Sequence, residues 1–143
     1  VCKGNQSPQQ DVLRQLWQEP VALNTLHRLL SRARKTFEGL AEFGVRDNTV
    51  IVTVLKPYVW DAEIFEKEAQ QALAERDEAA IEKAIGLYKG SFLGAFTSPW
   101  SEEQRDHYEG LYLKLLETSF EVASSEALRS YARQRLQDYM DVE

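Results

Sequence analysis

The clearest chemistry in this sequence lies in a run of cationic and polar side chains between residues 21 and 38. Arginines and lysines at helical spacing can reach the phosphates or guanine edges of a DNA duplex, and polar residues near a helix N-terminus can contact bases or phosphates. The candidate DNA contacts are Asn24, Thr25, His27, Arg28, Ser31, Arg32, Arg34 and Lys35, with Lys56 further along the chain. The spacing alone leaves a second interpretation open, an amphipathic helix whose charged residues simply face water.

No constellation typical of an enzyme is present. The sequence has no Gly-rich phosphate loop, no Gly-x-Ser-x-Gly elbow and no His-Glu-x-x-His motif. His27 and His107 are far apart, and each is expected in a solvated or structural role on a helix surface. Cys2 is expected to be an ordinary thiol, and one cysteine with two histidines is too few for a structural zinc site. We predict neither catalysis nor a metal or cofactor.

Charge is distributed unevenly along the chain. Residues 1–57 carry 8 Lys+Arg and 5 Asp+Glu, a net charge of +3, whereas residues 58–143 carry 9 and 18, a net charge of −9. A basic part joined to an acidic part suggests that one meets a polyanion and the other meets proteins. Chance asymmetry between two solvated surfaces explains the same numbers, because +3 is small for a nucleic-acid binder.

Length and composition place the chain among globular proteins. Its 143 residues suit one ordinary domain or two very small ones, and 43% hydrophobic with 28% charged residues argues against disorder. No apolar run approaches the roughly 20 residues of a membrane helix, and the N-terminus lacks a signal peptide's apolar region. A single cysteine is compatible with a reducing cytoplasm, the expected location. The absence of an initiating Met suggests a fragment of a longer protein.

The cationic run is expected on the second of two helices. Ser7-Pro8-Gln9-Gln10 predicts the first helix, with Ser7 as N-cap and Gln10 completing a capping box, and Pro20 ends it. The second helix is expected from about Val21 to Leu40, with Gly39 near its C-terminal end. Its apolar stripe steps by three and four residues and consists of Leu23, Leu26, Leu30, Ala33 and Phe37.

A β-hairpin is expected to follow this helix. Residues 49–55 are rich in β-branched side chains and predict a strand, with 58–60 as a short partner strand and the bend near 55–57. A short helix, a turn, a long basic helix and a hairpin follow one another in the order of a winged helix-turn-helix. In that arrangement the long helix lies in the major groove, and Lys56 near the wing tip touches a neighbouring phosphate.

From Asp61 onward the pattern is helical. Helices are predicted over about 62–76, over 78–89 with Asp77 as cap, from a capping box at Ser101–Gln104 to about Ala123, and over 126–139. The loop 91–100 is expected to bury its own aromatic residues. Successive helix pairs of this length resemble tetratricopeptide-type units in architecture. A concave face near Phe92, Phe96, Trp100 and Tyr108 could receive a helix or peptide, or these aromatics could form the domain's own core.

Several motifs together resemble a known family of bacterial regulators. Residues 23–35, LNTLHRLLSRARK, resemble the recognition helix of activators of the Streptomyces antibiotic regulatory protein type, whose pattern there is Asn-Leu-x-x-x-x-Ser-Arg-Leu-Arg-Lys-like. Residues 13–17 resemble the preceding helix and 52–61 the wing strands. Residues 85–93, IGLYKGSFL, followed by Pro99-Trp100-Ser101-Glu102-Glu103 and Arg105, resemble the bacterial transcriptional activator domain. The resemblance spans about residues 7–123.

This resemblance implies a mainly α protein with a small β-hairpin that regulates bacterial transcription. It implies a partial winged helix of the response-regulator type over residues 1–60, whose missing sheet and first helix would precede Val1. It implies a helical domain over residues 61–143 that contacts RNA polymerase or other domains of a longer chain. The expected partner is double-stranded DNA, bound by one copy of the chain or by a homodimer. The alternative is a protein-interaction module of a larger regulator without DNA binding of its own.

Overall fold

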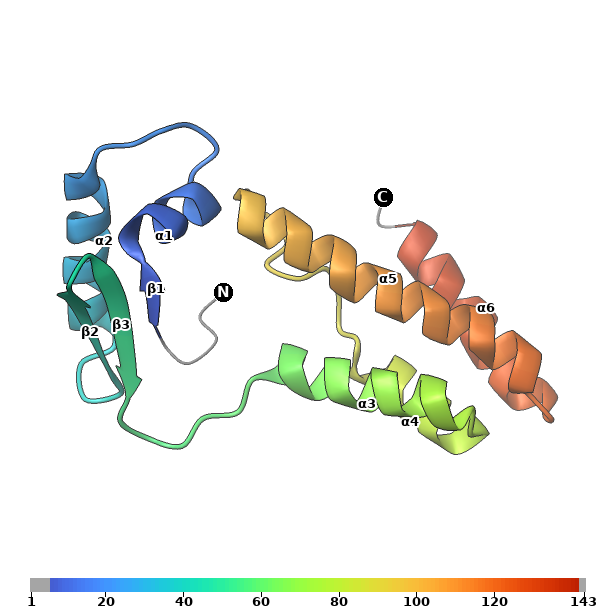
Figure 1. Cartoon of the computed structure of the whole chain (residues 1–143). Helices are drawn as coiled ribbons and strands as arrows, with labels where there is room; N and C mark the ends of the chain where they lie inside the picture. Colours follow the sequence, from blue (N-terminus) through green and yellow to red (C-terminus); the bar gives the residue numbers. More distant parts are fainter. Residues whose placement is uncertain (1–5, 142–143) are drawn as a thin grey trace. The chain divides into compact units, whose positions relative to one another are not determined.

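The structure, a computed structural model, describes residues 6–141 and is mainly helical with one small antiparallel sheet (Figure 1). The expectation of a mainly α fold with a small hairpin is therefore confirmed. The described residues form two compact units. The first contains the chain up to Val59 together with Ala95–Glu103, and the second contains Trp60–Gly94 and the chain from Gln104 onward. Each unit has its own apolar core.

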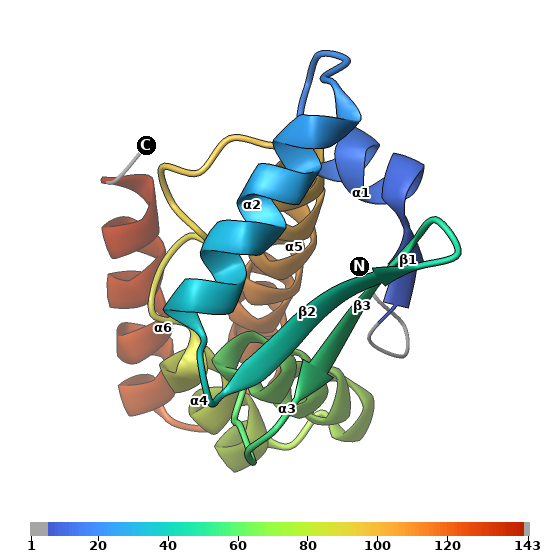
Figure 2. The same cartoon turned by 90° about the vertical axis from the view of Figure 1, so that its left-hand side faces the viewer.

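The first unit combines two helices with the sheet. Strand β1 (Gln6–Pro8) leads into helix α1 (Gln9–Leu16), and helix α2 (Leu23–Thr36) follows after a turn. Strands β2 (Ala41–Arg46) and β3 (Thr49–Val54) form an antiparallel hairpin, and the strand order is β1-β3-β2. Figure 2 shows α2 running beside the hairpin. The predicted long helix is thus shorter at both ends than the expected 21–40.

The hairpin closes through a two-residue turn, Asp47-Asn48. Arg46 pairs with Thr49, and both turn residues have positive φ values, 49° and 58°. Such φ values match the twist of the strands and are tolerated best by Gly, Asn and Asp. The prediction of a strand at 49–55 is confirmed, but the prediction of its partner at 58–60 is wrong, because β2 precedes the turn and 58–60 form no strand.

The start of the first predicted helix also differs from expectation. Ser7 does not cap α1, since it lies in β1 opposite Val50, and Pro8 occupies the cap position without a side-chain hydrogen bond. The backbone N–H of Gln9 instead donates to the carbonyl of Asn48 at 2.8 Å. The predicted capping box is therefore wrong, because pairing with β3 holds the chain extended at these residues.

The core of the first unit joins both helices to the sheet. Its buried side chains are Leu13, Leu26, Leu30 and Val50, with Phe43 and Val52 among the partly buried residues packed against them. The predicted apolar stripe of α2 is confirmed at Leu26 and Leu30 but is wrong at its ends, since Leu23 and Phe37 are 40% and 44% exposed. The sheet is too small to cover the full length of the helix.

The second unit contains the remaining helices close to the predicted bounds, except that the first residues of α5, up to Glu103, belong to the first unit. They are α3 (Asp61–Glu75), α4 (Glu78–Leu87), α5 (Pro99–Val122) and α6 (Glu126–Met140). The predicted cap of α4 is confirmed, because the Asp77 carboxylate accepts from the N–H of Ala80 at 2.9 Å. Ser125 caps α6 in the same way through the N–H of Leu128.

Helix α5 begins three residues earlier than predicted. The N–H of Ser101 donates to Ser98 Oγ at 3.1 Å, and the N–H of Ser98 donates to Ser101 Oγ at 2.9 Å. This reciprocal pair is a capping box with Pro99 at the first helical position, so the predicted box at 101–104 is wrong. The expectation that loop 91–100 buries its aromatics is also wrong at Phe96, which is 53% exposed.

Aromatic rings and small residues share the core of the second unit. Tyr88 and Tyr112 stack with ring centroids 4.1 Å apart, and Phe65 packs 5.5 Å from Tyr88. Fully buried alanines such as Ala69 and Ala132 lie in the same core. The small alanine side chains leave space in the core for the neighbouring aromatic rings, which are larger than aliphatic side chains.

The hairpin turn generates a first prediction. Asn48→Val should lower the free energy of unfolding by about 1–2 kcal/mol, because a β-branched residue is strained at positive φ. Asn48→Gly is the matched control and should be at least as stable as the parent. Urea unfolding followed by circular dichroism measures both, and equal stabilities of the two variants would contradict the turn assignment.

The contact between α4 and the start of α6 generates a second prediction. Glu78 accepts from Ser124 Oγ at 2.5 Å and from Ser125 Oγ at 3.1 Å, and these hydrogen bonds lower its pKa below the ordinary value. The carboxylate therefore stabilises the fold above the unfolded-state pKa of 4.5, and this stabilisation is lost as the pH falls through the lowered folded-state pKa.

Glu78→Gln should consequently lower the melting temperature at about pH 7, and the difference from the parent should shrink towards about pH 3. Glu82→Gln, at an exposed position on the same helix, is the control. A difference that stays constant with pH would show that the charge of Glu78 is not the source of the stabilisation.

Candidate nucleic-acid interface

Helix α2 presents one polar and cationic face to solvent. Leu26 and Leu30 point into the core, and the opposite side of the helix is exposed. The exposed predicted contacts on this side are Asn24, His27, Arg28, Ser31, Arg32 and Lys35. Their spacing of three and four residues places them together along the helix. The structure therefore brings most of the predicted DNA contacts onto one surface.

The charge on this helix has a single sign. Residues 23–36 include four Arg or Lys and no Asp or Glu. Arg34 and Lys35 lie in the last turn, where cations interact favourably with the negative end of the helix dipole. From Asn24 to Lys35 the helix rises about 16 Å, at about 1.5 Å per residue. This length suits a helix lying in a major groove about 12 Å wide.

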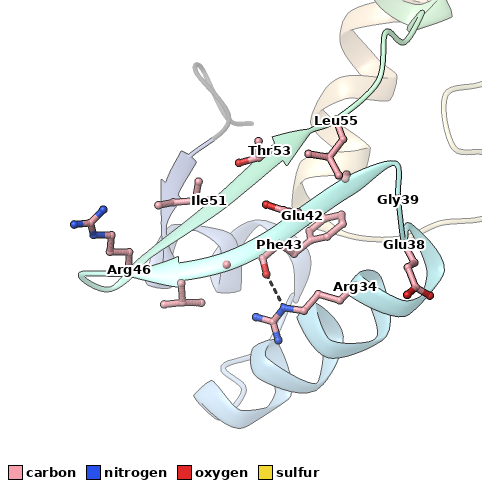
Figure 3. A pocket seen from close by; sticks show the side chains of 12 residues that line it. Arg34, Glu38, Gly39, Glu42, Phe43, Arg46, Ile51, Thr53 and Leu55 are labelled. Atoms are coloured by element: carbon pink, nitrogen blue, oxygen red, sulfur yellow. Dashed lines mark hydrogen bonds between the residues drawn. The ribbon is translucent and has the colours of Figure 1, made fainter.

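Three predicted contacts occupy other positions. Thr25 is partly buried, and its N–H donates to the carbonyl of Ala22 at 2.9 Å. Arg34 donates from Nε to the carbonyl of Phe43 on β2 at 2.6 Å (Figure 3). Lys56 follows the C-terminal end of β3, at the opposite end of the hairpin from the Asp47-Asn48 turn. Its predicted place near the wing tip is therefore wrong.

Arg46 is the basic residue beside the hairpin turn, and the sequence analysis missed it. Its side chain is 84% exposed and lies at the far end of β2 from Gly39 in Figure 3. Arg46 Nε lies 4.0 Å from Asp47 Oδ2, but this ion pair is exposed to solvent and therefore does not hold the Arg46 side chain firmly. The sequence does contain a hairpin signal around Arg46. Asp47-Asn48 separates residues 41–46, in which apolar residues alternate with others, from the β-branched residues 49–54.

A hollow of about 540 Å³ lies along the outer edge of β2. Figure 3 shows Arg34 and Glu38 from the end of α2 on one side and Arg46 near the turn. Glu42 also lines the hollow, so charges of both signs surround it. The purely cationic surface of the unit is the exposed face of α2.

The four aromatics predicted as a partner surface do not share one unit. Phe92 and Tyr108 pack on each other in the second unit, with ring centroids 5.1 Å apart, and Tyr108 is buried. Burial raises the pKa of the Tyr108 hydroxyl, with smaller contributions from the carboxylates of Glu66, Glu63 and Asp61. Phe96 and Trp100 lie in the 95–103 segment of the first unit. Phe92 and Tyr108 thus belong to a core, as the alternative interpretation held.

One arginine connects two of the motifs that carry the family resemblance. Arg105 on α5 donates from Nε to the carbonyl of Phe92 and from Nη2 to the carbonyl of Gly94, each at 3.2 Å. Leu93 between them has a positive φ of 50°. The Tyr-Lys-Gly-x-Phe-Leu element and the arginine that follows the tryptophan therefore act together in holding the loop after α4.

The described residues contain neither a metal-binding cluster nor a membrane span. No group of three His, Cys, Asp or Glu side chains among them is arranged to hold a metal ion. None of the described helices is both long and apolar enough to cross a membrane. Cys2, considered above as a thiol, lies outside the described residues.

Comparison with known families defines the class of the chain. Residues 60–143, more than half of its length, match the bacterial transcriptional activator domain. The chain therefore belongs to the bacterial transcriptional activator domain family, a family of regulatory proteins and not of enzymes. No curated protein and no solved structure matches it. The family match lies C-terminal to α2 and the hairpin.

The Arg105 contacts generate a third prediction. Arg105→Ala should lower the free energy of unfolding by about 1–3 kcal/mol, because two backbone carbonyls lose a charged donor. Lys114→Ala, at an exposed position of the same helix, should change stability by less than about 0.5 kcal/mol. Urea unfolding measures both, and an equally small effect of the two substitutions would contradict a structural role for Arg105.

Proposed function

We propose that this member of the activator family is a DNA-binding transcriptional regulator whose helix α2 enters the major groove. The observation that carries the proposal is the exposed face of α2, which combines cations and polar side chains with no acidic residue. Arg28, Arg32 and Lys35 would contact phosphates or guanine edges, and Asn24 would contact a base edge or phosphate. In this arrangement α1 braces α2 through the buried Leu13 and Leu26.

The hairpin would serve as a wing beside α2. Arg46 stands next to the Asp47-Asn48 turn and is well placed to meet a phosphate adjacent to the groove. The order of α1, α2 and the hairpin is that of a winged helix-turn-helix. The proposed DNA-binding part is residues 1–60, and the proposed partner-contacting part is residues 61–143.

The second part would bind protein. Residues 58–143 carry a net charge of −9, which disfavours contact with DNA. A helical domain of this kind in a transcriptional regulator is suited to contacts with the transcription machinery or with other domains. A homodimer on paired half-sites is compatible with this scheme.

Fluorescence anisotropy with a mixed-sequence duplex tests the DNA-binding proposal. The chain should bind at about 50 mM salt, and the affinity should fall steeply towards about 200 mM, because phosphate contacts release counterions. Absence of binding at the lower salt concentration would overturn the proposal for this chain and favour a protein-interaction module.

Arg32 provides the residue-level prediction. Arg32→Ala should weaken DNA binding by roughly tenfold and reduce the slope of log affinity against log salt by about 1. Lys114→Ala removes an exposed cation from α5 and should leave both quantities unchanged. An unchanged affinity and slope in Arg32→Ala would contradict the assigned orientation of α2.

A further inference from the structure

We propose that Arg34 is a positioning residue that fixes the hairpin against α2 and does not contact DNA. The inference rests on the proposed function, within which sequence analysis gave Arg34 the same role as Arg28, Arg32 and Lys35. Its position on the helix and its hydrogen bond assign it a different one.

Arg34 lies at the flank of α2, in line with His27 but about 100° or more around the axis from Arg28, Arg32 and Lys35. Successive helical residues are rotated by about 100°, so Arg34 is about 160° from Arg32 and about 100° from Lys35 around the axis. It is closer to Leu30, which is one turn earlier and 5% exposed in the core. Figure 3 shows its side chain reaching from α2 to β2. A groove facing Arg32 would therefore not face Arg34.

The acceptor of Arg34 is a carbonyl at the outer edge of the sheet. Arg46 and Thr49 flank a two-residue turn, so every second residue of β2 directs its backbone N–H and carbonyl toward β3. Counting from the turn, these residues are 46, 44 and 42. The bond from the N–H of Leu55 to the carbonyl of Leu40 continues the same alternation. Phe43 falls between these positions, so its carbonyl points away from β3. Arg34 Nε donates to it at 2.6 Å.

Two further contacts join the end of α2 to this edge. The N–H of Ala41 donates to the carbonyl of Phe37 at 3.0 Å, and the rings of Phe37 and Phe43 lie 5.7 Å apart. Like Phe43, Ala41 is a β2 residue whose backbone N–H and carbonyl point away from β3. The ring contact and the Arg34 hydrogen bond both reach Phe43, in the middle of the strand. The directional contact of the two is the Arg34 hydrogen bond. It therefore limits rotation of the hairpin about its connection to α2.

This contact sets where Arg46 stands relative to the cationic face of α2. Arg46 is three residues beyond Phe43 on the same strand. Core packing of Val50, Phe43 and Val52 holds the sheet on the helices, and the Arg34 bond further narrows the orientations in which the hairpin presents Arg46 to the duplex. Holding it in advance reduces the ordering cost of binding.

The first test uses the free protein and needs no DNA. In Arg34→Ala, amide hydrogen exchange at Gly44 and Arg46 should accelerate by about tenfold, the factor expected for loss of one hydrogen bond, while exchange at Leu30 stays unchanged. Arg32→Ala is the matched control and should leave all three amides unchanged. Unchanged exchange at Gly44 and Arg46 in Arg34→Ala would overturn the proposal.

The second test separates positioning from phosphate contact. Glutamine carries an N–H donor the same number of bonds from the backbone as arginine Nε, but no charge. Arg34→Gln should keep hairpin protection, DNA affinity and salt slope close to those of the parent, whereas Arg32→Gln should lose about tenfold in affinity. A loss in Arg34→Gln as large as in Arg32→Gln, with the slope reduced by about 1, would show a direct phosphate contact and overturn the proposal.

A double-mutant cycle completes the design. Arg46→Ala should weaken DNA binding several-fold in the parent but by less than about twofold in the Arg34→Ala background, because the far end of the hairpin is held less firmly there. The effects of Arg32→Ala and Arg46→Ala should instead be additive. Additivity of Arg34→Ala with Arg46→Ala would overturn the positioning role. If the parent binds no DNA, the proposed function fails, and the exchange experiment still decides whether Arg34 holds the hairpin.

Discussion

The arrangement of the first unit depends on two consecutive residues with positive φ, Asp47 and Asn48. They fix the hairpin register, and that register places Phe43 opposite Val52 on the face that packs against α2. The carbonyl of Asn48 also accepts the N–H of Gln9, so the same turn holds the start of α1. A slip by one residue would reverse the faces of β2 and remove the packing of both helices.

The second unit is held together differently. Its core consists of stacked and tilted aromatic rings with small residues between them, and its loops are held by charged donors on backbone carbonyls. The carbonyls of Phe92 and Gly94 accept from Arg105, and that of Tyr88 accepts from Arg135 Nη2 at 2.8 Å. These bonds explain how arginines on α5 and α6 stabilise the segment after α4 in this chain: the loop is irregular, and its carbonyls need donors.

Two arginines separated by one residue on α2 have different surroundings. Arg32 faces solvent, and Arg34 donates to the strand beside the helix. Arg32 on the helix and Arg46 near the hairpin turn would contribute to one cationic surface, and Arg34 would fix the hairpin beside it. Residues 58–143 are acidic, in contrast to the cationic face of α2. Their negative charge would repel DNA from the part of the chain that bears the family match.

Sequence patterns alone predicted the helical class, a strand at 49–55, the approximate bounds of most helices and the resemblance of the second unit to its family. The chain's sequence was sufficient for these because they follow from local periodicity, caps and short motifs. It also placed the cations of α2 on a solvent-facing helix. The folded arrangement was needed to show that β2 pairs with β3, that Ser7 is in a strand, and that Arg34 bonds to Phe43. These depend on which segments meet in space. A strand pairing or a side-chain contact between distant residues is chosen by packing of the whole unit, which local spacing does not encode.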